Sequence, residues 1–190
     1  MNQLEIKPIW TDDDYELMGW HDCPIRGVAF LDDSDYGAGQ FDSKLAFDID
    51  YIFKWGLVET EKEPSYSFYI SPCTLVFEQA YDVTLNGSTV GYTPVFPQIN
   101  CLTIKLNEES LKRNYRCYDV CIELHNSEPI TFQSTGFKQY VRKPPLLVES
   151  QCLSITHRGG VHFDLTTITA MIHLPVPSVS GQQAEEGGDE

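Results

Sequence analysis

Residues 45–55 read LAFDIDYIFKW, and this stretch decides the fold. Every second side chain is apolar or aromatic, and the positions between them include Asp48, Asp50 and Lys54. Alternation with a period of two is typical of a β-strand that buries one face and exposes the other. We therefore expect the two aspartates and the lysine to face water. The inward-facing set is then Leu45, Phe47, Ile49, Tyr51, Phe53 and Trp55.

Shorter strands are expected on both sides of this stretch. Many short strands separated by turn residues, with little helix, favour a mainly β chain (β-rich α+β). We expect an antiparallel β-sandwich or an open barrel with one or two short helices. Thr11 or Asp12 can cap one helix, and Asn107 can cap another. The further strands are expected at Ile25–Leu31, Tyr66–Ile70, Cys73–Gln79, Tyr81–Leu85, Cys101–Leu106, Arg116–Leu124, Ile130–Thr135, Cys152–His157 and Val161–Leu165.

The chain has the length of one ordinary domain, at 190 residues. No stretch before residue 178 has the composition of an interdomain linker, so we expect residues 1–177 to form a single β-rich domain. From residue 178 onward the chain is mostly Gly, Gln, Ser and acids. We expect residues 178–190 to form a disordered acidic tail, because they have no apolar face to bury.

The charge excludes two classes of partner. The chain carries 28 acidic and 13 basic residues, a net charge of −15. Nucleic acids and anionic membranes both need a basic binding surface, so we expect neither as a partner. The acids are concentrated, because residues 1–50 hold 12 acids and three bases while residues 51–177 are nearly neutral. A partner attracted by this charge would be a basic protein; the alternative is that the charge serves solubility.

Two acidic clusters are candidates for steering such a partner. One is Asp12, Asp13 and Asp14, which alternatively stabilise the start of the first helix through its dipole. The second cluster is Asp32, Asp33 and Asp35, which alternatively belong to a solvated loop between strands.

The chain shows no export or membrane signal. The first ten residues, MNQLEIKPIW, lack the basic flank and apolar run of a secretory signal. No apolar run approaches the roughly 20 residues that cross a bilayer. None of the six cysteines forms a C-x-x-C pair. We therefore expect a cytoplasmic protein with reduced thiols and no cofactor.

One candidate binding site combines Trp20, His21 and Asp22 with Asp48 and Asp50. If the first three residues packed against the polar face of the central strand, one histidine and three carboxylates would gather. Such a group can bind a divalent cation or hold an acid of perturbed pKa. The alternative is that Trp20 anchors a helix on the core, His21 makes local hydrogen bonds and the acids of the strand face water. One histidine is a weak basis for a transition-metal site, so no metal is assigned.

Four segments of the chain carry a resemblance. They are Gly19-Trp20-His21-Asp22, Leu45-Ala46-Phe47-Asp48-Ile49-Asp50-Tyr51-Ile52, Thr74-Leu75-Val76-Phe77-Glu78 and Thr135-Gly136-Phe137-Lys138-Gln139-Tyr140. In that order they resemble a group of small uncharacterised bacterial proteins, over about Trp20 to Phe163. The group implies no catalytic residue. The size, acidity and β-rich pattern are also similar, in a general way, to immunity proteins of bacterial toxin systems.

The functional expectation follows from these features together. We expect a non-enzymatic cytosolic protein-binding protein, immunity-like or accessory, that meets a basic partner through an acidic surface. One alternative is a β-barrel that binds a small ligand or divalent metal at the candidate site. A second alternative is a hydrolase-like enzyme, although the chain has no G-x-S-x-G elbow and no phosphate-binding glycine motif, so no catalytic residue is assigned.

Overall fold

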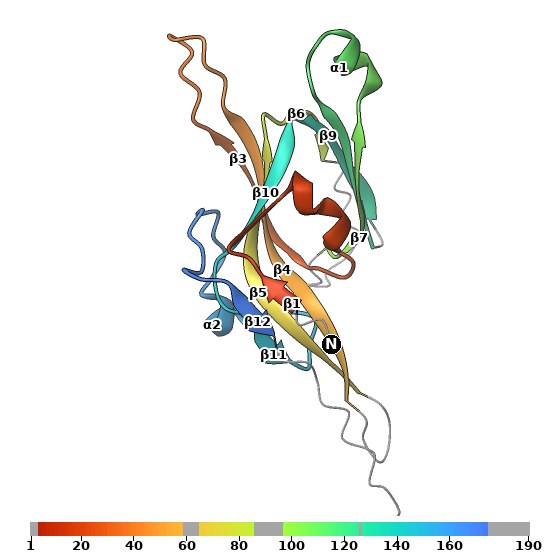
Figure 1. Ribbon diagram of the computed structural model, residues 1–190, viewed down its shortest axis with the longest axis vertical. Coiled ribbons are helices and arrows are strands. Elements are labelled where there is room, and N and C mark those ends of the chain that lie inside the picture. The colour runs from red at the N-terminus through yellow and green to blue at the C-terminus, as the bar shows by residue number, and fades with distance from the viewer. Residues whose placement is uncertain (1–3, 59–64, 86–96, 126, 175–190) are drawn as a thin grey trace, which may run out of the picture.

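The computed structural model describes residues 4–58, 65–85, 97–125 and 127–174 (Figure 1). Within these residues the chain is mainly β and its sheets are antiparallel, as the sequence predicts; it has three sheets and three short helices, one helix more than the one or two expected. None of the three sheets closes into a barrel. The elements are β1 (Leu4–Ile6), β2 (Ile9–Thr11), η1 (Asp12–Leu17), β3 (Ile25–Asp32), β4 (Ser43–Val58), β5 (Ser65–Glu78), β6 (Tyr81–Leu85), β7 (Ile99–Leu106), α1 (Glu108–Lys112), β8 (Tyr118–Leu124), β9 (Ser127–Ser134), β10 (Gly136–Val141), β11 (Leu146–Val148), α2 (Ile155–Arg158) and β12 (Ile172–Leu174).

The long strands β4 and β5 form the centre of the largest sheet. Its strand order is β2-β10-β5-β4-β3, and β11 pairs with β5 beyond the end of β10. Strand β4 runs antiparallel to β5 with Phe47 opposite Leu75 and Ile49 opposite Cys73. Figure 1 shows these two strands as a curved pair through the middle of the molecule. Strands β3, β10 and β11 extend this pair within the same sheet, and other elements cover the two faces of the sheet.

One face of the β4–β5 pair is the predicted apolar core. Leu45, Phe47 and Ile49 are fully buried, and Tyr51 is nearly so, which confirms this part of the predicted alternation. The alternation breaks after Ile52, where the register with β5 shifts at a β-bulge. A bulge inserts one extra residue and reverses the faces that follow. Trp55 is therefore exposed rather than inward, contrary to the prediction.

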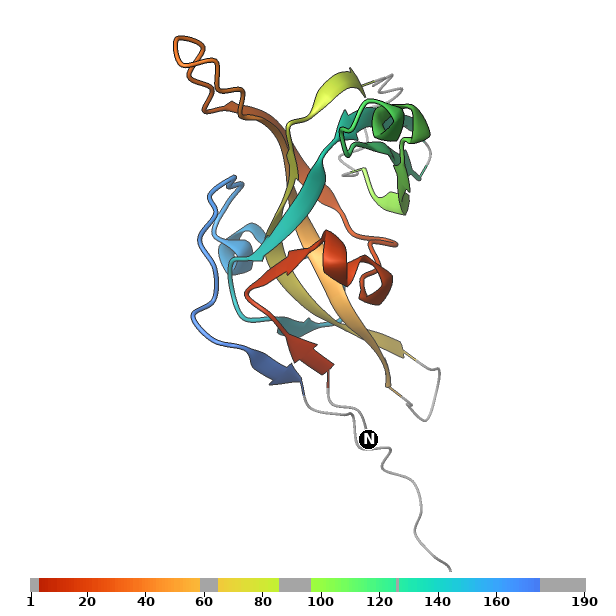
Figure 2. The ribbon, with the colours of Figure 1, turned by 45° about the horizontal axis from the view of Figure 1, so that its top comes forward.

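The four-stranded sheet β6-β9-β8-β7 packs over this apolar face. Phe132 of β9 is the central contact, with its ring centroid 4.7 Å from that of Phe77 and 6.3 Å from that of Phe47. Val120 and Ile122 of β8 belong to the same core. Figure 2 shows strands β7, β8 and β9 of this second sheet in green to teal, with η1 beside them.

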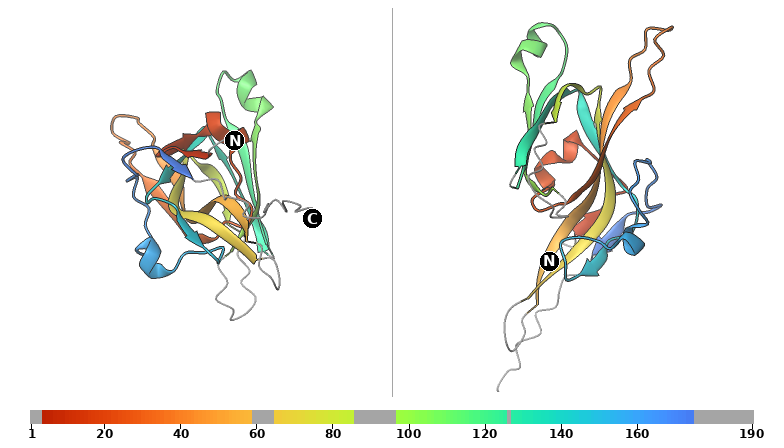
Figure 3. Two further views of the ribbon diagram at one scale, coloured as in Figure 1. Left: turned by 60° about the horizontal axis from the view of Figure 1, so that its bottom comes forward. Right: turned by 180° about the vertical axis from the view of Figure 1, so that it is seen from behind.

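The opposite face of β4 is also covered, and this corrects the sequence prediction. Asp48 and Asp50 do not face water; both are fully buried. The chain that follows β10, which includes α2 and leads to β12, lies on this side of the large sheet. Figures 2 and 3 show it in blue, on the side away from the second sheet. Residues 45–52 of β4 are therefore buried on both faces of the sheet.

Two predicted strands lie in this covering segment, and both predictions are wrong. Residues 155–158 form the short helix α2, and residues 161–165 form no strand. The Ser154 hydroxyl accepts a hydrogen bond from the His157 N–H, and Gly159 adopts the left-handed conformation with φ of 85°. These are the start and stop signals of a helix. Residues 161–165 pack by side chain instead, with Phe163 lying against the bare backbone of Gly27.

The two helices that the sequence predicts, one after Thr11 and one after Asn107, are confirmed. Helix η1 follows Thr11, and α1 follows Asn107, whose side chain accepts a hydrogen bond from the Ser110 N–H at 3.0 Å. The predicted tail, residues 178–190, lies outside the described residues. All six cysteines are free thiols. In the described part of the chain no helix is both long enough and apolar enough to span a membrane.

Candidate functional site

The structure divides the predicted five-residue site into two separate groups. Asp48 and Asp50 are bound by arginines. Arg158 donates to both carboxylate oxygens of Asp48 at 2.6 and 2.8 Å, and its Nε donates to Asp50 at 3.1 Å. Arg26 Nε donates to the second oxygen of Asp50 at 2.8 Å, and Arg142 donates to Asp48. We call these five side chains the arginine–aspartate network.

Backbone groups complete the hydrogen bonding of this network. The His162 N–H donates to Asp48 and the Leu153 N–H donates to Asp50, each at 3.0 Å. Burial by itself lowers the pKa of Arg158, but its bonds to the two aspartates outweigh this and raise the pKa, so the guanidinium stays charged. Four donors fill the lone-pair sites of Asp48, and three donors with two guanidinium charges surround Asp50, so neither carboxylate is open to a metal ion. The network therefore holds the covering segment onto β4 and is not a ligand site.

Trp20 is part of the core, as the alternative interpretation of the sequence predicts. The indole is buried, and its ring contacts Tyr51 and Phe137 edge to face. The indole N–H donates to the buried amide oxygen of Gln139 at 2.9 Å. Trp20 thereby fixes the segment that carries His21 and Asp22.

His21 and Asp22 meet a histidine that the sequence analysis did not assign to the site. Asp22 Oδ1 lies 3.0 Å from His125 Nε2, and Asp22 Oδ2 lies 3.2 Å from His21 Nδ1. The two imidazole rings are edge to face, with centroids 5.4 Å apart. Gln151 donates from its side-chain amide to Asp22 Oδ2 at 3.0 Å. We call His21, Asp22 and His125 the histidine–aspartate cluster.

Backbone hydrogen bonds join the segments that carry this cluster. The Asp22 N–H donates to Ile99 C=O at 2.8 Å, and the His125 N–H donates to Gln98 C=O at 2.9 Å. The Cys23 N–H donates to Trp20 C=O, which closes a turn around Asp22. Asp22 has a φ of 64°, in the left-handed region that aspartate and asparagine tolerate better than most residues. The carboxylate is thus held by a rigid turn.

A hollow of about 330 Å³ adjoins the cluster. Its lining includes His21, Trp20 and Tyr15, together with the exposed thiol of Cys101 on β7. The wall combines aromatic surface with a few polar atoms, which is the usual composition of a small-molecule site. The cluster and the hollow are the features of the predicted site that remain available to a ligand.

The predicted steering cluster of Asp32, Asp33 and Asp35 lies at the end of a projecting hairpin. Residues 30–42, between the outer part of β3 and the start of β4, extend away from the body of the molecule on the side opposite α1 (Figure 1). We call residues 30–42 the acidic arm. It contains four aspartates and no lysine or arginine, and Lys44, just beyond it, forms ion pairs with Asp33 and Asp42. The Ser34 side chain, the Tyr36 hydroxyl and the Ser34 N–H, in that order, lower the pKa of the Asp32 carboxyl and keep it charged.

Aromatic side chains accompany these charges. Phe30, Tyr36 and Phe41 are 65%, 66% and 67% exposed, although each is large enough to anchor a core. The rings of Tyr36 and Phe41 touch edge to face, with centroids 5.8 Å apart. Phe41 also lines a hollow of about 460 Å³, together with Tyr81 of β6 and Tyr115 in the loop between α1 and β8. The arm therefore presents apolar surface and negative charge at the same place.

The other predicted steering cluster, Asp12, Asp13 and Asp14, is only partly exposed to solvent. Asp12 and Asp13 are exposed at the start of η1, but Asp14 is buried. Burial alone would raise the pKa of Asp14, but its bonds from Lys7 and from the Thr11 N–H outweigh this and lower it. Asp14 thus stabilises the start of the helix, as the alternative interpretation predicts.

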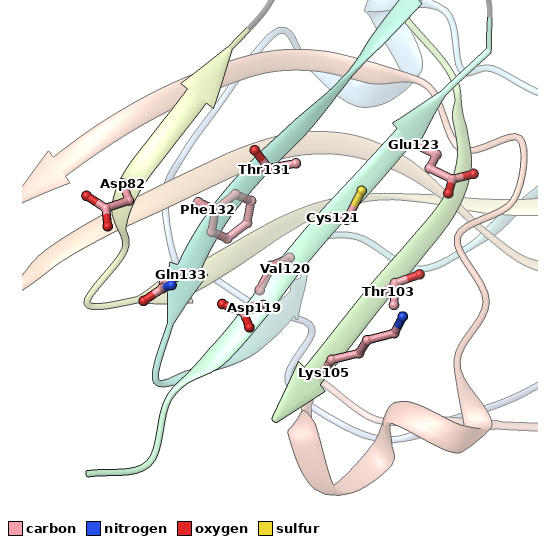
Figure 4. Close-up of a pocket in the computed structure, with 10 residues that line it drawn as sticks. All are labelled: Asp82, Thr103, Lys105, Asp119, Val120, Cys121, Glu123, Thr131, Phe132 and Gln133. Atoms are coloured by element: carbon pink, nitrogen blue, oxygen red, sulfur yellow. The ribbon is translucent and has the colours of Figure 1, made fainter. Parts of the chain in front are cut away.

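A further hollow of about 420 Å³ lies on the outer face of the second sheet, and Figure 4 shows its lining. Cys121 is in this wall, with Lys105 and Glu123 on the flanking positions. Burial raises the pKa of the Cys121 thiol, which disfavours the nucleophilic thiolate. The described residues of this wall include no histidine. The hydrolase-like alternative gains no support here.

Comparison of the chain with family models, curated proteins and solved structures found no match. The resemblance to small bacterial proteins and the likeness to immunity proteins therefore stay predictions.

Sequence reasoning missed the residues that complete both groups. Arg26, Arg142 and Arg158 come from three separate segments with no common spacing. His125 directly follows the end of β8, and Gln151 lies in the covering segment. An isolated histidine beside a strand end is a weak signal, because it gains meaning only when the tertiary contact is known.

Proposed function

We propose that this chain is a non-enzymatic cytoplasmic protein that binds a basic protein partner through the acidic arm. The observation that carries the proposal is the exposure of Phe30, Tyr36 and Phe41 among four aspartates on a projecting hairpin. Scattered exposed apolar residues are ordinary, but a cluster on a projecting element marks an interaction site. The likeness to immunity proteins is a general one and agrees with a binding role.

The negative charge of the acidic arm favours a partner that presents lysine or arginine side chains. Within the arm, the hydrogen bonds that lower the pKa of Asp32 keep its charge in place, and Asp35 is held by bonds from the Gly37 and Ala38 N–H groups. A lysine or arginine side chain approaching these carboxylates also meets the faces of Tyr36 and Phe41, where cation–π attraction adds to the ion pairing. The aromatic rings supply the apolar area that exposed ion pairs by themselves do not provide.

The hollow beside the arm adds a place for one anchoring side chain. Phe41, Tyr81 and Tyr115 contribute its aromatic wall. The Tyr81 hydroxyl lies 3.1 Å from Cys117 Sγ, which fixes the ring at the rim of the second sheet. A partner that contacts both the arm and this wall spans two sheets of the protein.

The experiment is site-specific photo-crosslinking in the source cell. A photoreactive phenylalanine analogue replaces Tyr36 in one version of the full chain and Leu165, an exposed residue of the covering segment, in the control. We expect residue 36 to capture a basic protein that residue 165 does not capture. We also expect Phe41→Ser to weaken binding of the purified partner more than Leu165→Ser does.

Two results would overturn the proposal. The first is capture of an acidic protein from residue 36. The second is a partner whose binding is equally sensitive to the two serine substitutions, because the arm would then contribute nothing specific.

A further inference from the structure

The histidine–aspartate cluster has the donor set of a metal site. His21, Asp22 and His125 each offer one ligand atom, and these atoms lie within 4.8 Å of one another. Two imidazoles with one carboxylate are a common set for Zn²⁺ and for other divalent transition metals. This cluster is distinct from the acidic arm, so the inference goes beyond the proposed protein binding and does not depend on it.

The distances suit an ion of this class. Zinc lies about 2.0–2.1 Å from each nitrogen or oxygen donor, which places neighbouring donors of a tetrahedron roughly 3.3 Å apart. The distance from His125 Nε2 to Asp22 Oδ1 is 3.0 Å and that from His21 Nδ1 to Asp22 Oδ2 is 3.2 Å, so each imidazole lies at about this separation from one of the two carboxylate oxygens. The ligand atoms of the two imidazoles lie within 4.8 Å of each other, and rotation of the His21 side chain, which is 61% exposed, can shorten this distance.

The surroundings hold the donors in position. Gln151 donates to the carboxylate of Asp22, in the manner of the outer hydrogen bonds that orient metal ligands. The backbone bonds of Asp22 and His125 to Ile99 and Gln98 bring the segments together before any ion binds. The net negative charge of the chain also concentrates cations near its surface. Binding an ion requires only that each imidazole carry its proton on the nitrogen that faces away from the ion.

We propose that His21, Asp22 and His125 bind one divalent transition-metal ion, with Zn²⁺ as the best match, beside the hollow that His21 also lines. Three protein ligands leave a tetrahedral ion one open position for water or a small ligand. The hollow, with Trp20 and Tyr15 in its wall, is the place where such a ligand would lie.

The test is calorimetric titration of the metal-stripped full chain with ZnCl₂, with MgCl₂ as the hard-cation contrast. Exposed thiols also bind zinc, so Cys101 and Cys152 are first replaced by serine in every version. The variants are Asp22→Asn and His125→Ala. Asparagine tolerates the left-handed backbone at residue 22, so the first variant keeps the fold. The matched control is His157→Ala, an exposed histidine outside the cluster.

We expect one Zn²⁺ per chain with a dissociation constant in the micromolar range or below, and no heat from Mg²⁺. Each cluster variant should weaken zinc binding at least tenfold, while His157→Ala should leave it unchanged. Absence of zinc binding in the serine background would overturn the proposal. So would binding that both cluster variants retain at full strength, since the ion would then lie elsewhere.

Discussion

Replacement of Arg158 by methionine is expected to destabilise the protein by about 3–5 kcal/mol, because the buried carboxylates of Asp48 and Asp50 then lose three charge-assisted hydrogen bonds. The Arg158 side chain is 1% exposed and makes three hydrogen bonds to Asp48 and Asp50. Methionine fills much of the same volume, so the loss reports on the missing hydrogen bonds to the two carboxylates rather than on a cavity. A loss of this size is a large part of a typical total stability of about 5–15 kcal/mol.

Urea unfolding followed by tryptophan fluorescence measures this loss as a lower midpoint at an unchanged slope. The control is Arg113→Met, an exposed arginine at the end of α1, for which we expect a change within about 0.5 kcal/mol. The double variant with Asp48→Asn should lose less than the sum of the two single losses, because the residues share one interaction. A loss below about 1 kcal/mol for Arg158→Met, or strictly additive losses, would refute the role assigned to the network.

Three further outcomes test the packing and the protonation states. Phe47→Ala should cost about 3–5 kcal/mol in the same assay, the usual loss for a fully buried phenylalanine; a cost near zero would place the core elsewhere. Asp14→Asn should cost about 1 kcal/mol at neutral pH, as helix-start residues do. Because folding lowers the pKa of Asp14, this contribution is present above the unfolded value near 3.9 and is lost as the pH falls through the folded pKa, so the wild type and variant should converge there. A thiol reagent at pH 8 should modify the exposed Cys101 and Cys152 before unfolding but not the buried Cys23, because burial raises the pKa of that thiol to about 12; early reaction of Cys23 would contradict the structure.

Local patterns in the sequence predict one face of the central strand and misjudge the other. The alternation around Phe47 indicates burial because apolar side chains have one favourable environment. Aspartates at the intervening positions have two favourable environments, because they can lie either in water or beside buried cations. Arg142 and Arg158, which decide between these cases for Asp48, follow it by about a hundred residues. No periodicity in the sequence connects them.

The covering segment shows a second limit. The run from Cys152 to His157 alternates well enough to resemble a strand, yet Ser154 and Gly159 cap a helix there. Those capping residues were a usable local signal. The position of His125 beside Asp22 had no such signal, because it depends on how the second sheet packs against the turn after η1.

The ionic-strength dependence of the association rate tests the acidic arm most directly. The association rate is measured by stopped-flow mixing with the purified partner that photo-crosslinking identifies. The wild type is compared with a variant in which Asp32, Asp33 and Asp35 are replaced by Asn and so lack their charges. A control variant removes three exposed acids elsewhere, through Gln substitution of Glu16, Glu108 and Glu109. The Debye length falls from about 30 Å at 0.01 M salt to about 10 Å at 0.1 M, so steering should weaken over that range. We predict that the wild-type rate falls steeply with salt, that the arm variant is slow and nearly insensitive to salt, and that the control stays close to the wild type. A wild-type rate that does not change with salt, or an arm variant that associates no more slowly than the control, would contradict the proposal.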